Sequence, residues 1–307
     1  DGAGPEVTIT DVACCVSGTT VDSSVIENSF NAWRFKATSG TVVRDTRPYV
    51  HVRFIDSDDN GFDDAAVLHS NGIPSTYDYD DTTSDAANTA NVCFDDPVAG
   101  PSASCYKIEA NVRVLVIPLN PVIAASTTPL AADDHSGMSI SGATFEIPTE
   151  VSPAGSGYAV NNDYSGWEVL DDCNGHAGSK GAPYHYHGDP TYPGNDGLSA
   201  HTQQANSAGD CLPDYTYAVD GATSHAPLIG FMADGFPIYG TDGYDVQPLD
   251  SCNGHTTSTG EFASGIYHYH ALSATVSLAQ SKPPLPECLS GEILFVPNYQ
   301  SPEMVQE

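Results

Sequence analysis

Short apolar stretches separated by turn-forming residues dominate this chain. Runs rich in Val, Ile, Tyr and Phe alternate with clusters of Gly, Pro, Asn and Asp, and helical periodicity is scarce. The pattern predicts an all-β fold of antiparallel, sandwich-like sheets joined by long loops. Strands are expected at residues 7–10, 49–55, 111–117, 144–147 and 293–296.

The polar segment 76–104 interrupts this series of apolar runs. It contains DYDD, TTSDAANTAN and FDDPVAGPSAS, which are too polar for a buried strand, so one extended acidic loop is expected. A disulfide between Cys93 and Cys105 could close part of it as a small ring.

The second half of the chain contains two similar segments. LDDCNGH at 170–176 precedes PYHYH at 183–187, and LDSCNGH at 249–255 precedes IYHYH at 266–270. We interpret them as a duplicated unit. The predicted organisation is a β-sandwich-like portion at 1–150, the duplicated portion at 151–290 continuous with it, and a strand-like tail at 291–307.

The spacing of the cysteines follows the same repeat. Cys211 lies 38 residues beyond Cys173 and Cys288 lies 36 residues beyond Cys252, so a disulfide within each unit is the simplest pairing. The other four cysteines are Cys14, Cys15, Cys93 and Cys105. Neighbouring cysteines rarely pair with each other because the geometry is strained, so Cys14 and Cys15 are expected to reach different partners or another chain.

The two CNGH and YHYH segments, with GFPIYG at 235–240 between them, resemble the YHYH domain family. SNGIP at 70–74 and VIPLNP at 116–121 add to the resemblance, which extends from about residue 5 to residue 290. It implies an extracellular protein and no particular reaction. The sequence departs from the family pattern at the adjacent Cys14 and Cys15 and in its last 17 residues, GEILFVPNYQSPEMVQE.

Paired histidines are the first candidates for chemistry. Residues i and i+2 of a strand share a face, so each HxH pair presents two imidazoles together, a common basis for binding zinc or copper. The alternative is that these rings are packed and hydrogen-bonded without a metal. The candidate ligands are His176, His185, His187, His255, His268 and His270, with Asp234 and His225 as further members of the same cleft.

DSDDNGFDD at 56–64 resembles an oxygen-rich calcium loop. Asp56, Asp58, Asn60 and Asp64 occupy positions one, three, five and nine, and a glycine at position six permits the sharp turn. Position twelve is Val67 instead of a bidentate glutamate, which weakens affinity. We expect calcium here, with a solvated acidic turn as the alternative.

Charge and cysteine content narrow the environment. The net charge of −31 opposes binding to nucleic acid and to anionic membranes. Eight cysteines indicate an oxidising compartment, so we expect a secreted mature chain without a transmembrane segment. No Asn begins an N-x-Ser/Thr sequon, which leaves O-linked glycan as the expected modification.

No catalytic residue can be assigned, because neither a GxSxG elbow nor an HExxH helix is present. We therefore expect a metal-binding structural protein, a subunit of an extracellular or surface assembly such as a fibril. The apolar tail at 292–299 and the strand at 7–10 could add to a neighbour's sheet edge, giving self-association. The alternative is a secreted metalloenzyme or a copper- or zinc-handling protein that uses the YHYH histidines.

Overall fold

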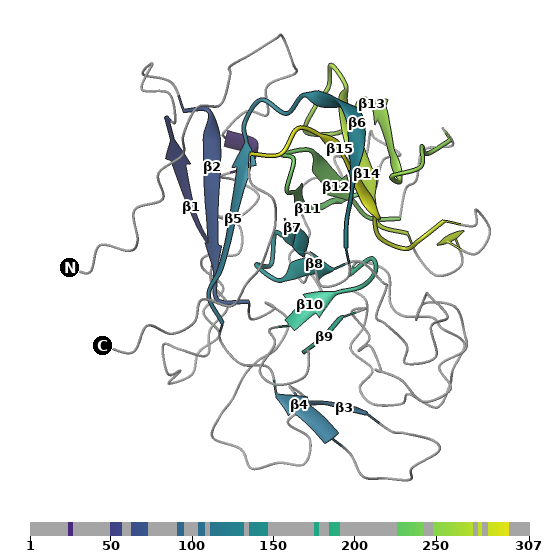
Figure 1. The fold of residues 1–307 in the computed structure, drawn as a ribbon. Coiled ribbons are helices and arrows are strands. Elements are labelled where there is room, and N and C mark those ends of the chain that lie inside the picture. Colours follow the sequence, from purple (N-terminus) through teal and green to yellow (C-terminus); the bar gives the residue numbers. More distant parts are fainter. Residues whose placement is uncertain are drawn as a thin grey trace.

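The computed structural model describes thirteen stretches of the chain, and within them strands dominate (Figure 1). This confirms the all-β prediction. Helical turns occur in the described part only at residues 24–26 and 276–277, and no described helix has the length and apolarity to cross a bilayer. The described residues are 24–26, 50–56, 63–72, 91–94, 104–107, 111–131, 135–146, 175–177, 184–190, 226–241, 248–272, 276–277 and 282–294.

An eight-stranded sheet forms the centre of the described structure and positions the candidate histidines. Its strands pair in the order β13-β14-β12-β11-β7-β8-β10-β9. In chain order they are β7 (His135–Ser139), β8 (Thr144–Glu146), β9 (Gly175–Ala177), β10 (Tyr184–Tyr186), β11 (Leu228–Met232), β12 (Pro237–Tyr239), β13 (Gly254–Thr257) and β14 (Ile266–His270).

The two halves of this sheet pair in the same way. β7 and β11 meet antiparallel at the centre, and each continues into an antiparallel partner, β8 or β12. β10 then lies parallel to β8, as β14 lies parallel to β12. β9 and β13 close the two edges in antiparallel pairs. The sheet is therefore mixed rather than purely antiparallel; the sequence duplication itself stays a prediction.

The turns of the β7–β8 and β11–β12 hairpins both depend on a glycine with positive φ. Gly142 has φ 91° and Gly235 has φ 84°, a region that side chains with a Cβ rarely adopt. A Cβ at Gly142 would lie 2.5 Å from Oγ of Ser70, and one at Gly235 would collide with the carbonyl oxygen of Pro118. Both turns therefore pack closely against a second sheet.

This second sheet consists of β1 (Val50–Ile55), β2 (Ala65–Ser70) and β5 (Arg113–Pro118), all antiparallel. It stands beside the eight-stranded sheet in Figure 1. The strands predicted at 49–55, 111–117 and 144–147 are thus present with small shifts in their bounds. One hydrophobic cluster reaches from Ile26 through both sheets to Leu289, so residues of the predicted first and second portions share a core.

Two further pairs complete the described strands. β6 (Ile123–Pro129) pairs with β15 (Cys288–Gly291), and β3 (Asn91–Phe94) pairs with β4 (Ser104–Lys107). β3 lies inside the segment that was expected to be one acidic loop, so that expectation was wrong for residues 91–94. Its apolar Val and Phe and the cross-strand pairing with β4 explain the difference.

The strand predicted at 293–296 is not present in its described part. Residues 293–294 lie outside any strand, and β15 ends just before them at Gly291. The Glu292 N–H still donates to the carbonyl of Val122 at 2.9 Å, after which the chain leaves the ladder. The strand predicted at 7–10 and the rest of the tail lie outside the described residues.

Cys252 and Cys288 form the disulfide that the repeat spacing predicts, with their Cα atoms 5.2 Å apart. It joins the turn before β13 to the first residue of β15. Cys93 and Cys105 face each other in the β3–β4 register, although their side chains are not described. Cys14, Cys15, Cys173 and Cys211 lie outside the described residues.

Candidate metal centre

Three histidines meet where β13 pairs with β14. His268 and His270 alternate with Tyr267 and Tyr269 along β14, so the two imidazoles share one face of the strand. His255 lies directly opposite His268 in the antiparallel register. A strand pair therefore brings the third ring to the HxH pair, as the sequence suggested.

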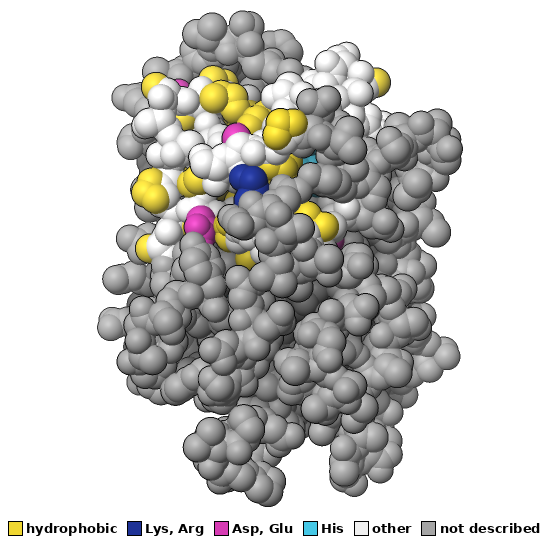
Figure 2. Space-filling view, turned by 90° about the vertical axis from the view of Figure 1, so that its right-hand side faces the viewer, with side chains coloured by type: hydrophobic (Ala, Val, Ile, Leu, Met, Phe, Trp, Pro, Cys, Tyr) yellow, Lys and Arg dark blue, Asp and Glu magenta, His cyan; other side chains and the backbone are white. Residues whose placement is uncertain are grey.

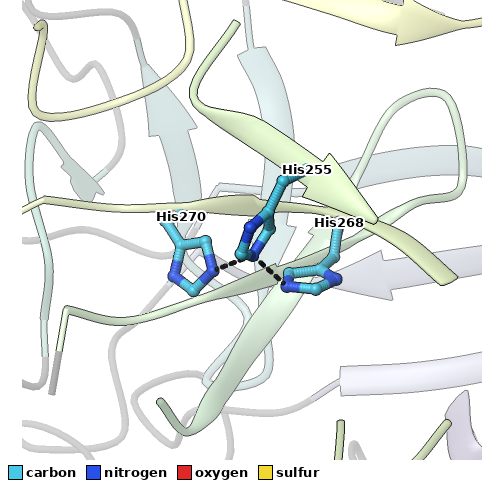
Figure 3. A group of neighbouring side chains, drawn as sticks. All are labelled: His255, His268 and His270. Atoms are coloured by element: carbon cyan, nitrogen blue, oxygen red, sulfur yellow. Dashed lines mark hydrogen bonds between the residues drawn. The ribbon is translucent and has the colours of Figure 1, made fainter. Parts of the chain in front are cut away.

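The three side chains point their Nε2 atoms toward one another (Figure 3). His255 Nε2 is 2.9 Å from Nε2 of His268 and 3.1 Å from Nε2 of His270. One nitrogen from each ring lies within 4.8 Å of the others. His268 and His270 are fully buried and His255 is partly exposed, so the cluster is open to solvent mainly on the His255 side.

Backbone carbonyls fix the other nitrogens of the two buried rings. Nδ1 of His268 lies 3.0 Å from the carbonyl of Ile266, and Nδ1 of His270 lies 3.1 Å from that of Gly240. A carbonyl only accepts, so each Nδ1 must carry a proton, and each neutral ring then presents a lone pair at Nε2. This is the arrangement that metal-binding histidines usually show.

Tyr239 supports the two buried rings from β12. Its ring centroid lies 5.0 Å from that of His268 and 6.2 Å from that of His270. Its hydroxyl bonds to Thr259 Oγ1 and Glu261 Oε2, both at 2.8 Å. Burial, followed by the charge of Glu261, raises the pKa of Tyr239 well above its ordinary value, so it stays a neutral donor.

The opposite face of β14 carries a separate polar network. The Tyr269 hydroxyl donates to Oδ2 of Asp234, which also accepts the Gly291 N–H at 2.8 Å. Burial raises the pKa of Asp234 from 3.8 to about 6, and the Tyr269 hydroxyl and backbone N–H groups oppose that rise. Asp234 thus lies with the tyrosine side of the strand and not among the three imidazoles, contrary to the prediction that it shares their cleft. The reason is that side chains alternate between the two faces of a strand, so Tyr269, and Asp234 bound to it, lie on the face of β14 opposite the histidines.

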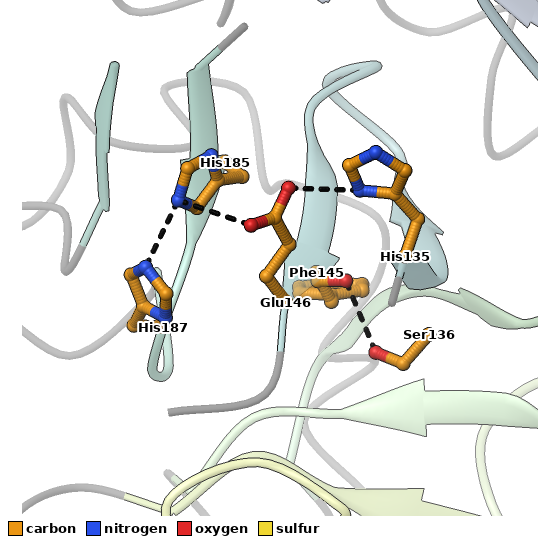
Figure 4. A network of polar contacts seen from close by, with 6 residues as sticks. All are labelled: His135, Ser136, Phe145, Glu146, His185 and His187. Carbon is orange, nitrogen blue, oxygen red and sulfur yellow. Dashed lines mark hydrogen bonds and ion pairs between the residues drawn. The ribbon is translucent and has the colours of Figure 1, made fainter. Parts of the chain in front are cut away.

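A second group of histidines lies in the other half of the sheet (Figure 4). Nε2 of His185 is 2.9 Å from Nε2 of His187 and 3.3 Å from Oε2 of Glu146, the last residue of β8. The other carboxylate oxygen, Oε1, is 2.8 Å from Nδ1 of His135 at the start of β7. His185, His187 and Glu146 are all buried.

Glu146 is held as an anion by its neighbours. Burial alone would raise the pKa of its carboxyl, but His185 and His135, with a smaller contribution from Arg113, outweigh burial and lower it. The second group therefore contains a buried carboxylate charge, which the first does not.

Among the described residues on the face shown in Figure 2, one small area of imidazole is visible beside uncharged and hydrophobic groups. The Thr241 N–H, just after β12, donates to Oδ2 of Asp189 at 2.5 Å, and Asp189 lies two residues beyond His187. This hydrogen bond links the segment after His187 to the end of β12, the strand whose Tyr239 packs against His268 and His270.

The remaining predicted ligands are only partly described. His176 lies on β9 opposite His185 in register, as His255 lies opposite His268, but its side chain is not described. His225, Asp58 and Asn60 lie outside the described residues. Asp64, at the end of the predicted calcium loop, donates its N–H to the carbonyl of Ile55 at 2.9 Å, which closes the β1–β2 hairpin.

Sequence reasoning missed Glu146, His135 and Tyr239. A signal was available in the similar hairpins GMSISGATFE at 137–146 and GFMADGFPIY at 230–239, which place Glu146 where the second hairpin has Tyr239. The sequence does not reveal that β8 and β12 each lie next to an HxH strand, so it could not identify these residues as neighbours of the imidazoles.

Fold and site together define an all-β protein with histidine clusters on the paired strands of one sheet. Residues 114–247, less than half of the chain, match the family model described as YHYH protein, which supports a YHYH domain-containing protein. The match includes the first HxH pair and GFPIYG, and the second HxH pair lies beyond it. No curated protein and no solved structure matches the chain.

Proposed function

We propose that this protein is a secreted metal-binding protein whose three imidazoles, His255, His268 and His270, hold one zinc or copper ion. The observation that supports this most strongly is the convergence of three Nε2 atoms, two of them on rings whose Nδ1 protons are committed to backbone carbonyls. A proton on His255 Nε2 can be donated well to only one of the two facing nitrogens. A divalent cation would satisfy all three lone pairs.

The spacing of the nitrogens fits such an ion. Tetrahedral coordination with bonds of about 2.0–2.1 Å places ligand nitrogens roughly 3.3 Å apart. The observed separations of 2.9 and 3.1 Å need only a small outward shift. Imidazole ligands suit both zinc and copper, and the same ligands bind Cu²⁺ more tightly than Zn²⁺.

Metal content tests the proposal. Protein purified without added metal and analysed by mass spectrometry of the elements should contain stoichiometric copper or zinc. His255→Gln should lower the affinity for both ions at least 100-fold, since it removes the most accessible ligand. His69→Gln is the matched control, because His69 is also a partly buried strand histidine, paired across β1 and β2 with the exposed His51. Equal affinity in wild type and His255→Gln would refute the proposal.

A structural role is the proposed use of this metal. The ion would join β13 to β14 beside the Cys252–Cys288 disulfide, and that disulfide also supports an oxidising, extracellular location. Assembly through the terminal strands and calcium at 56–64 remain part of the proposal. Chelation by EDTA should lower the melting temperature, since ions bound only to the folded state stabilise it by mass action; an unchanged melting curve would remove the calcium and structural-metal proposals.

The second candidate function is a metalloenzyme or a copper- or zinc-handling protein. Three protein ligands leave a coordination position for water or another ligand, as in catalytic zinc sites, and the partial exposure of His255 favours access. Azide is a suitable probe: a spectral shift of the Cu²⁺-loaded protein on adding azide supports an open position, and an unchanged spectrum supports the structural role.

A further inference from the structure

We infer that Glu146, His185 and His187 form a second metal site, which uses mixed nitrogen and oxygen ligands and selects a harder ion than the three-imidazole centre. The residues belong to the other half of the sheet. The inference therefore does not require the zinc or copper centre proposed above.

The strand register places the two sites in equivalent positions. His185 pairs with His176 across β10 and β9, as His268 pairs with His255 across β14 and β13. On the other side, Tyr186 pairs in parallel with Phe145, as Tyr269 pairs with Ile238. The next residue along is Glu146 in β8 and Tyr239 in β12. The first half of the sheet thus has the carboxylate of Glu146 at the position where the second half has the phenol of Tyr239.

The position of the Glu146 carboxylate suits a metal ligand better than a residue that only orients the imidazoles from a distance. His185 Nε2 faces both His187 Nε2 at 2.9 Å and Glu146 Oε2 at 3.3 Å. A single ring nitrogen has one proton or one lone pair, so it cannot satisfy both neighbours with good hydrogen bonds. A cation bound between these groups would take one lone pair from each. The two separations that involve His185 are close to the roughly 3.3 Å between ligands in a tetrahedral site, and the side chains of His187 and Glu146 would turn toward each other to complete it.

Burial adds to this argument. His185 and His187 are 3% and 5% exposed and Glu146 is 9% exposed, so an anionic carboxylate is removed from water beside two imidazoles. Arg113 is also close enough to act on this charge. A buried carboxylate needs a partner charge or strong hydrogen bonds, and a bound divalent ion supplies the charge directly.

His135 is the positioning residue of the site. Its Nδ1 lies 2.8 Å from Oε1 of Glu146, which leaves Oε2 turned toward His185 (Figure 4). The adjacent Ser136 hydroxyl donates to the carbonyl of Phe145 at 3.1 Å and fixes the backbone just before Glu146. Such outer contacts orient a ligand and typically change metal affinity 10- to 100-fold when removed.

The ligand set indicates the class of ion. Two imidazoles and one carboxylate with open positions are typical of Fe²⁺ sites, and carboxylate oxygen also suits Mn²⁺, whereas imidazole alone favours copper and zinc. We therefore expect Mn²⁺ to bind at Glu146 and to bind weakly, if at all, among the three imidazoles.

Metal titration of the full chain tests the inference. After chelator treatment, wild-type protein should bind two Co²⁺ ions by equilibrium dialysis, and Glu146→Gln and His255→Gln should each bind one. Mn²⁺, followed by electron paramagnetic resonance, should bind wild type and His255→Gln but at least 100-fold more weakly to Glu146→Gln. Glu292→Gln, the same charge change at an exposed glutamate, is the control and should match wild type.

Different failures separate this inference from the proposed function. If Glu146→Gln keeps the Co²⁺ stoichiometry and Mn²⁺ affinity of wild type, the second site is refuted, whatever His255→Gln shows. If only His255→Gln is without effect, the three-imidazole proposal fails and the second site stands. Should Glu146→Gln unfold, Glu146→Asp keeps the charge but withdraws it by one methylene, and its Mn²⁺ affinity should fall at least 10-fold; wild-type affinity would refute the site.

His135→Gln tests the positioning role. It should weaken Mn²⁺ binding 10- to 100-fold while the protein still takes up two Co²⁺ ions at saturation. A purely structural histidine would change the melting temperature and leave the Mn²⁺ affinity of the folded protein as it was, and that result would refute the role.

Discussion

The two halves of the eight-stranded sheet share one pairing scheme but surround their histidines with different chemistry. In the half from β11 to β14, three imidazoles converge with a neutral tyrosine behind them. In the half from β7 to β10, two imidazoles face an ionised glutamate. The backbone therefore places the histidines at equivalent positions in the two halves, and a few side chains determine the charge that surrounds them.

The tyrosine faces of the two halves differ in the same way. In both, one tyrosine ring packs edge-on against the next, Tyr184 on Tyr186 at 5.3 Å and Tyr267 on Tyr269 at 5.2 Å. The Tyr186 hydroxyl bonds to a neutral serine, Ser141, at 3.2 Å, whereas the Tyr269 hydroxyl bonds to the carboxylate of Asp234. The tyrosine rings therefore pack alike in the two halves, but among the described contacts only the second half has a carboxyl group bound to the tyrosine hydroxyl.

Removal of the disulfide should have the largest effect on the second half. It closes a separation of 36 residues around β13 and β14, so Cys252→Ser with Cys288→Ser should lower the free energy of unfolding by about 4 kcal/mol. Urea unfolding followed by fluorescence measures this. An unchanged midpoint would mean that the histidine strands are held without the crosslink.

Equivalent polar positions give a direct comparison of the halves. Asp234→Ala leaves the buried Tyr269 hydroxyl and Gly291 N–H without their acceptor, which should cost about 3 kcal/mol. Ser141→Ala removes a neutral hydrogen bond and should cost about 1 kcal/mol. Equal losses in denaturant unfolding would show that the charge on Asp234 is unimportant.

Asp234 should make the stability of the second half depend on pH. The pKa of Asp234 rises from 3.8 to about 6 on folding, so the folded state binds this proton more tightly. Its contribution is fully present below about pH 3.8 and is lost as the pH rises through 6. At about 1.4 kcal/mol per pKa unit, the loss is roughly 3 kcal/mol.

Asp234→Asn should remove that slope, measured as the difference between the stability profiles of variant and wild type from pH 4 to 7. Ser141→Ala, which carries no titrating group, should keep the wild-type slope. A slope retained by Asp234→Asn would assign the pH dependence to other carboxyl groups.

Glycines next to the tyrosines provide the smallest and sharpest comparison. A Cβ at Gly175 would collide with the Tyr184 hydroxyl, and one at Gly254 with the Tyr267 hydroxyl. Tyr184 is fully buried and cannot move away, whereas Tyr267 is only partly buried. Gly175→Ala should therefore cost about 2 kcal/mol and Gly254→Ala about 1 kcal/mol in thermal unfolding. The reverse order would contradict the burial argument.

Local patterns in the sequence predicted the strands and the shared face of each HxH pair. The period of two is a property of any extended chain, so His268 and His270 had to point the same way. The spacing of Cys252 and Cys288 likewise predicted their disulfide. His255, the histidine of the second CNGH segment, was also among the predicted ligands.

Contacts between distant strands could not be predicted in this way. Glu146 reaches His185 only because β8 and β10 lie parallel, and Asp234 meets Tyr269 through the alternate face of β14. Helical or strand periodicity says nothing about which strands become neighbours. The contact of Glu146 with His185 and that of Asp234 with Tyr269 were therefore both determined by pairing over long sequence separations.

The parallel pairs β8–β10 and β12–β14 bear on how fast the protein can fold. Parallel neighbours cannot be joined by a tight hairpin, so a long connection must close before each HxH strand reaches its place. Such non-local pairing slows folding, because chain entropy is lost before the contacts form. In the nascent chain the β13–β14 hairpin can bring His255 to His268 and His270 locally, whereas Glu146 can reach His185 only after the long connection between β8 and β10 has closed.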